Sequence, residues 1–254
     1  KIIEAARYCK NDLCSEIVYE FPELQGIMGG KYLKNEGFSE DICLAVAEHY
    51  LPAFYKDALP STRYGALVSI ADKIETLISI FISGKRPSGS SDPYALRRNL
   101  NGVIKIIWDY EFNLQLDNLF NELVDFWKIA IPNLNFSKAK VSNDLNDFLV
   151  QRIVSHLEEL SLGKELIKAV CSSDEFSQKR IFNIVDLKNR IESIVKFKEK
   201  ETFVEIQKVI TRVSKLANSS NLSKEVLSTK DFINTKLFEK DCEFKVFEFI
   251  RELE

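Results

Sequence analysis

One segment constrains the fold more than any other. Residues 66–82 are apolar almost throughout, and Asp72, Lys73 and Glu75 are their only charged side chains. A helix that is apolar on nearly all sides lies inside a core. The whole chain has only 9 Gly and 6 Pro in 254 residues, too few for the tight turns of a strand-rich protein. The sequence therefore predicts an all-α protein built around a central helix over residues 66–82.

Charge and hydropathy exclude two broad classes of protein. The 35 Lys and Arg are balanced by 38 Asp and Glu, so the net charge is −3 and no global basic field attracts nucleic acid. Any nucleic-acid surface has to be local. No run approaches the roughly 18 consecutive apolar residues of a membrane span, and we expect no membrane partner.

The cysteines and histidines are too scattered to predict a site. No C-x-x-C pair occurs, and we interpret the thiols as buried groups of a reducing compartment. With only His49 and His156, the sequence excludes a His-rich metal site, and we expect His156 to be structural. The cysteines are Cys9, Cys14, Cys43, Cys171 and Cys242.

The strongest candidate for a binding site is the Gly/Ser-rich loop 84–98. Asp92 followed by Pro93 predicts a helix start, with Asp at the N-cap and Pro at the first helical position. A loop that runs into a helix N-terminus offers free N–H groups and the positive end of the helix dipole to an anion. The alternative is a capped loop with solvated cations. The four cations around it are Lys85, Arg86, Arg97 and Arg98.

Two further patterns describe the organisation of the chain. Residues 131–137 are the best linker candidate, and an amphipathic helix over 144–160 follows them. The chain also begins at Lys1 and ends at Glu254 inside helical patterns. We therefore expect it to be a piece of a longer protein.

Five sequence blocks, in matching order and spacing across residues 1–108, resemble the β subunit of bacterial-type glycine–tRNA ligase. Looser blocks at 148–153, 168–170 and 212–217 resemble the C-terminal anticodon-binding domain of that family. The five blocks are EFPELQGIMG (20–29), EHYLP (48–52), ALP (58–60), IADK (70–73) and SGSSDPYALRR (88–98).

The resemblance implies two helical domains. Residues 1–131 form an HD-like domain with trailing helices, lacking its N-terminal part, and residues 137–254 form an anticodon-binding bundle lacking its C-terminal tail. The family works as a tetramer of two α and two β subunits. Its α subunit acylates tRNA with glycine, using ATP and magnesium, and its β subunit supplies most of the tRNA-binding surface. We expect this piece to hold no catalytic residue and no cofactor, and its partners to be glycine tRNA and the α subunit, in the cytoplasm or a plastid.

Electrostatic contacts to the phosphate backbone are the mechanism that we expect for RNA binding, because such contacts position RNA without reading its sequence. The basic loop supplies Lys85, Arg86, Arg97 and Arg98 for these contacts. The expected anticodon-side candidates in the C-terminal bundle are Arg180, Arg190, Arg212 and Lys215.

The HD resemblance raises a second possibility, a metal-dependent phosphohydrolase. Such enzymes hold a metal through a His, a His-Asp doublet and a later Asp. The doublet position here is Asn11-Asp12 and the later acid is Asp72. Asn is a poor substitute for imidazole at a transition-metal site, so we expect a degenerate site in which Asp72 pairs with a base in the core. A third possibility is a pure subunit-assembly module.

Overall fold

The computed structural model describes residues 1–54, 56–88, 91–171, 182–198, 202–219 and 233–253. Within those ranges the chain is helical, with no β-strand and two isolated bridges, Ser88–Ser91 and Gln115–Asn183. The predicted all-α fold class is confirmed. The chain divides into two compact units, residues 1–195 and 196–254.

Short helices make up the first part of the larger unit. Its small core contains Ala5, Cys43 and Val46, which pack with Val68 of the central helix. Gly26, with a φ of +78°, separates the 3-10 turn Pro22–Leu24 from the helix that begins at Ile27. The elements are α1 (Ile2–Tyr8), α2 (Glu16–Glu20), α3 (Ile27–Asn35), α4 (Glu40–Glu48) and the 3-10 turns Asn11–Cys14 and Pro22–Leu24.

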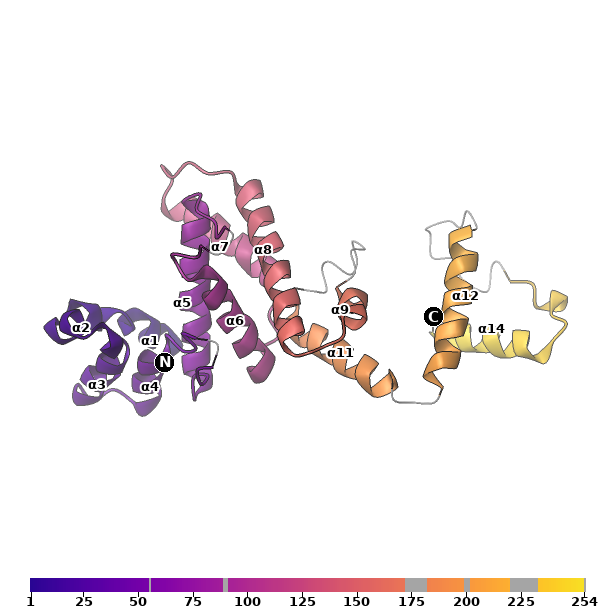
Figure 1. Cartoon of the computed structure of the whole chain (residues 1–254), viewed down its shortest axis with the longest axis horizontal. Coiled ribbons are helices and arrows are strands. Elements are labelled where there is room, and N and C mark those ends of the chain that lie inside the picture. Colours follow the sequence, from indigo (N-terminus) through magenta and orange to yellow (C-terminus); the bar gives the residue numbers. More distant parts are fainter. Residues whose placement is uncertain (55, 89–90, 172–181, 199–201, 220–232, 254) are drawn as a thin grey trace. The chain divides into compact units, whose positions relative to one another are not determined.

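The central helix is α5 (Arg63–Ile82), and it is buried as the sequence predicts. Thr62 caps it, since its side-chain oxygen accepts a hydrogen bond from the Gly65 N–H at 3.0 Å. Three long helices pack against it around the main core (Figure 1). They are α6 (Leu96–Tyr110), α7 (Leu116–Ala130) and α8 (Lys138–Glu159).

Residues 131–137 connect two helices that share this core. Phe120 and Val124 of α7 and Leu145 and Leu149 of α8 belong to the same hydrophobic cluster. The larger unit thus includes the segment that the sequence suggested as a linker, and it continues through α9 (Lys164–Val170) and most of α11 (Ile184–Lys198). The division into HD-like and anticodon-binding domains stays a prediction.

The smaller unit contains α12 (Phe203–Ser219), a 3-10 turn at Thr235–Leu237 and α14 (Asp241–Leu253). Among the described residues, no helix combines the length and the apolar character that a bilayer crossing requires. All five cysteines are free thiols. Cys14 ends the 3-10 turn Asn11–Cys14 and Cys242 lies on α14. Both are exposed, so the expectation of buried thiols is wrong for these two.

A buried lysine holds the segment after α4 against the core. Lys73 of α5 is 4% exposed, and its ammonium donates to the Tyr50 carbonyl at 2.9 Å. Its side chain passes so close to Gly102 of α6 that a Cβ there would lie 3.0 Å from the Lys73 Cε. The absence of a side chain at position 102 therefore allows α6 to pack over Lys73.

Lys73 makes the stability of the fold depend on pH. Burial lowers its pKa from 10.5 to about 8, so between these values the unfolded chain holds a proton that the folded chain has lost. Stability contributed by this group therefore rises as the pH increases from about 8 to 10.5.

We predict that Lys73→Met removes this rise. The difference in free energy of unfolding, wild type minus variant, is expected to increase between pH 8 and 10.5 when both are unfolded in urea. A pH-independent difference over this window contradicts the assignment. Exposed Lys128 lies on another helix, and Lys128→Met serves as the control.

Candidate nucleic-acid interface

The loop before α6 is capped differently from the prediction. The helix begins at Leu96 instead of Pro93, and Ala95 before it adopts the left-handed conformation with a φ of 56°. Asp92 still caps the helix, because its two carboxylate oxygens accept hydrogen bonds from the N–H groups of Leu96 and Arg97 at 2.8 and 2.9 Å. The carboxylate therefore fills the anion position that the sequence assigned to a ligand.

Arg86 anchors this loop to α8. Its Nε and Nη2 donate to one Asp144 oxygen at 3.0 and 2.7 Å, and its Nη1 donates to the Phe81 and Lys85 carbonyls at 2.6 and 2.8 Å. The guanidinium also lies 4.1 Å from the centre of the Phe81 ring. All three guanidinium nitrogens are thus engaged within the chain.

Lys85 and Arg97 lie nearer to solvent but contact the same loop. The Lys85 ammonium donates to the Tyr94 hydroxyl and lies 4.8 Å from the centre of that ring. Arg97 Nη1 donates to the Ser91 carbonyl at 3.2 Å. These contacts orient both cations while leaving Lys85 exposed.

Arg98 starts a polar row that runs along α6. Asn101 and Lys105 follow it at spacings of three and four residues, which place all three side chains on one face of a helix. The Arg98 side chain is exposed and its guanidinium lies 5.3 Å from the Phe54 ring centre. No hydrogen bond or ion pair joins it to the residues that the structure describes.

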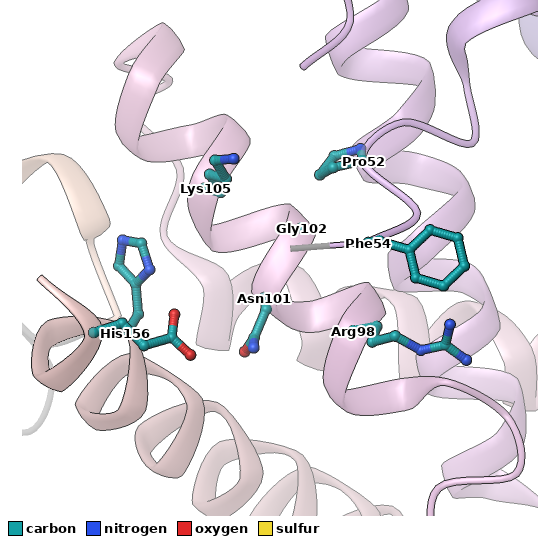
Figure 2. Close-up of a pocket in the computed structure, with 8 residues that line it drawn as sticks. Pro52, Phe54, Arg98, Asn101, Gly102, Lys105 and His156 are labelled. Atoms are coloured by element: carbon teal, nitrogen blue, oxygen red, sulfur yellow. The ribbon is translucent and has the colours of Figure 1, made fainter. Parts of the chain in front are cut away.

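A small pocket opens between this face and α8. Figure 2 shows Arg98, Asn101 and Lys105 on α6, His156 facing them from α8, and Pro52 and Phe54 closing a third side. Glu159 also lines the pocket, whose volume is about 50 Å³.

Helix α8 places a cation, Arg152, and a neutral base, His156, on its side of this region. Burial lowers the pKa of Arg152, and the charge of Arg97 lowers it further. Burial also lowers the pKa of His156, whose ring packs edge-on against Trp108 with centroids 5.5 Å apart. The structural role expected for His156 is thus supported by this packing, and the residue also lines the pocket.

Sequence reasoning did not select Asn101, Lys105 or Arg152. Helical spacing is enough to predict the row at 98, 101 and 105, since none of these positions belongs to the apolar face of α6. The opposing residues of α8 cannot be predicted in this way, because they contact α6 only through tertiary packing.

None of the described C-terminal candidates is among the residues that line this pocket. Arg190 of α11 pairs with Asp186 at 2.9 Å and donates from Nη1 to the Val170 carbonyl at 3.3 Å. Arg212 and Lys215 are exposed on α12 in the smaller unit. Arg180 lies outside the described residues.

The positions compared with an HD metal site form an ammonium-centred cluster instead. Lys10 pairs with Asp72 at 2.9 Å, which confirms the expectation that Asp72 meets a base. Its ammonium also lies 3.0 Å from His49 Nε2 and 3.9 Å from the centre of the Tyr50 ring. Burial opposes the Lys10 charge, but the hydrogen bond and charge of Asp72 outweigh it and raise the Lys10 pKa.

His49 is a neutral acceptor in this cluster. Burial, and after it the charge of Lys10, lowers its pKa from 6.5 to about 4. Its Nδ1 lies 2.6 Å from the Val46 carbonyl and so carries the proton, which leaves Nε2 to accept from Lys10. The ammonium thus occupies the place beside Asp72 and His49 where a cation would bind.

Asp12 serves the backbone. Its Oδ2 accepts from the N–H groups of Gly26 and Gly29 at 2.6 and 3.0 Å. Asn11 begins the 3-10 turn Asn11–Cys14 that carries Asp12. Among the described residues, no group of three or more His, Cys, Asp or Glu side chains is arranged to hold a metal ion.

Comparison with known proteins assigns the chain to a family. A family model described as glycyl-tRNA synthetase beta subunit matches residues 1–172. The chain belongs to this family. The resemblance carried by the five sequence blocks is therefore confirmed.

Relatives named glycine–tRNA ligase beta subunit match almost the whole chain. The protein from Trichodesmium erythraeum is 37% identical over 256 residues, which cover 99% of this chain and 35% of the relative. That from Acaryochloris marina is 37% identical over 246 residues, covering 96% and 34%. The chain thus spans about a third of the length of these glycyl-tRNA synthetase beta subunits.

The contacts of Arg86 predict a structural role for it. Arg86→Lys is expected to lower the free energy of unfolding by about 1–3 kcal/mol, because a lysine cannot replace the fork of charged hydrogen bonds. Chemical denaturation measures this, with Arg98→Lys as the exposed control. A double-mutant cycle with Asp144→Asn tests the pair directly, and additive effects of the two substitutions contradict it.

The ammonium-centred cluster predicts that divalent metals do not change the stability of the protein. Excess manganese is expected to leave the melting temperature unchanged, because the Lys10 charge repels a second cation beside Asp72. Thermal unfolding in manganese, against potassium at equal ionic strength, measures this. A metal-dependent rise in melting temperature, or phosphate release from a nucleotide, would favour the HD-type phosphohydrolase.

Proposed function

We propose that this chain is the tRNA-positioning part of a glycine–tRNA ligase β subunit. It holds glycine tRNA while the α subunit of an α2β2 tetramer acylates it in the cytoplasm or a plastid. The observation that carries the proposal is the exposed cation Arg98 on α6, in a chain of this family. Its guanidinium is free of ion pairs with the described residues.

The rigidity of α6 supports this function. Apolar residues along α6 are buried in the core, so the opposite face of the helix is fixed relative to the core. A cation on such a helix loses little further entropy when it meets a phosphate. The buried residues are Leu96, Leu100, Val103, Ile104 and Ile107.

The loop cations divide between two roles in this proposal. Arg86 holds the loop against α8 through Asp144, and this leaves Lys85, Arg97 and Arg98 to face the RNA backbone. Phosphate contacts of this kind position the RNA and carry no sequence information.

Recognition of the anticodon arm belongs to the C-terminal part in this proposal. Arg212 and Lys215 on α12 are its described candidates, together with Arg190 and with Arg180 beyond the described residues. This piece supplies no catalytic residue in our proposal. ATP, magnesium and glycine bind at the α subunit.

A salt series tests the proposal. Fluorescence anisotropy with glycine tRNA is expected to show binding by the αβ complex that weakens steeply with salt. Arg98→Gln is expected to weaken glycine tRNA and a non-cognate tRNA about equally, and to reduce the salt slope by about one, because one phosphate contact is lost.

Two observations complete this test. Lys128→Gln on α7 is the control, and its affinity and salt slope should match the wild type. No tRNA binding at low salt by a folded complex contradicts the proposal. That outcome, with the α subunit still bound, favours the pure subunit-assembly module.

A further inference from the structure

An aromatic ring lies in solvent beside the exposed cation of α6. Phe54 is 62% exposed, and the Arg98 guanidinium lies over its ring at 5.3 Å from the centre. Figure 2 shows these two side chains next to each other, among the residues that line the pocket. Because most of the Phe54 surface stays open, this ring keeps apolar area in water that a partner can cover.

The backbone that carries Phe54 is fixed on both sides of the ring. Before it, the Leu51 carbonyl accepts a hydrogen bond from Ser69 Oγ of α5 at 2.5 Å. After it, one carboxylate oxygen of Asp57 accepts from the N–H groups of Ala53 and Phe54 at 2.9 and 2.8 Å. A ring on a fixed backbone loses little further entropy when a partner packs against it.

The basic loop repeats the combination of an aromatic ring and a cation. Tyr94 is 38% exposed, and the Lys85 ammonium lies 4.8 Å from the centre of its ring. The residues proposed to face RNA are therefore accompanied by aromatic surface as well as by positive charge.

The chemistry of the pair at positions 54 and 98 selects a nucleotide. An aromatic ring stacks on another flat π-system, and a guanidinium attracts a phosphate. A nucleotide carries both groups, a base and a phosphate. Proteins that bind RNA stack unpaired bases on aromatic side chains. A base inside a duplex has both faces covered by its neighbours, so the ring requires a base with a free face.

We propose that Phe54 stacks on one unpaired base of the bound RNA, with the phosphate of the same nucleotide at Arg98. The proposal rests on the proposed function, since it requires that RNA binds here. It adds an uncharged contact to a surface otherwise described by charge, and it directs this part of the chain to a single-stranded segment of the RNA.

A salt series separates stacking from charge. The αβ complex carrying Phe54→Ala in the β subunit is titrated with glycine tRNA by fluorescence anisotropy. We expect binding about tenfold weaker at every salt concentration, because a stacked base is lost. The salt slope should stay that of the wild type, since stacking releases no counterions, whereas Arg98→Gln reduces it.

Two further variants serve as controls for this series. Phe126 of α7 has the same 62% exposure, and Phe126→Ala should leave the affinity for tRNA unchanged. Phe54→Tyr keeps the ring and should bind as tightly as the wild type.

The variant Phe54→Trp reports the stacking directly. It should bind at least as tightly as the wild type, and its added indole fluorescence should be quenched when tRNA binds, because the ring contacts a base. The signal is the difference from the wild-type complex in the same titration. Phe126→Trp should show no such quenching.

Unchanged affinity of the Phe54→Ala complex overturns the inference. Weaker binding with a reduced salt slope also overturns it, because Phe54 would then only position Arg98. So does an indole of Phe54→Trp that keeps its fluorescence while tRNA is bound. If the wild-type complex binds no tRNA at low salt, the proposed function itself fails.

Discussion

The burial of α5 is the constraint on which the rest of the larger unit depends. Its Val68 belongs to the small core with Ala5 and Val46, and its Ile74 and Ile78 belong to the main core with α6, α7 and α8. One apolar helix thus contributes residues to both hydrophobic clusters, and each cluster buries part of its surface. Two of the charged groups of α5, Lys73 and Asp72, hold the segment after α4 and Lys10 in place.

The candidate RNA surface follows from this packing. Because α6 buries its apolar face against α5, its remaining positions form an outward row with little freedom. The loop before it is then held by Asp92 at the helix end and by the tie from Arg86 to Asp144. The basic loop that the sequence singled out is accordingly divided into residues that build the surface and residues that present charge on it.

Local pattern made much of the fold predictable. Helical periodicity identified the buried stripes of α6 and α8, since spacing of three and four residues needs no knowledge of partners. The start of α6 was placed too early, because a carboxylate can cap from outside the first turn. Arg86 and Asp144 lie 58 residues apart, and no local rule reveals such a pair. The pocket could not be predicted for the same reason, because it exists only where α8 packs against α6.

Gly102 connects the core to the candidate surface in a way that bears on sequence change. A side chain there would press on Lys73 beneath it and approach Pro52 to within 3.4 Å, so the position tolerates almost no enlargement. The Arg98 side chain, one turn earlier on the helix, is exposed instead. A substitution at position 98 can therefore change the charge of this face without moving α6, whereas a larger residue at position 102 would push α6 away from Lys73.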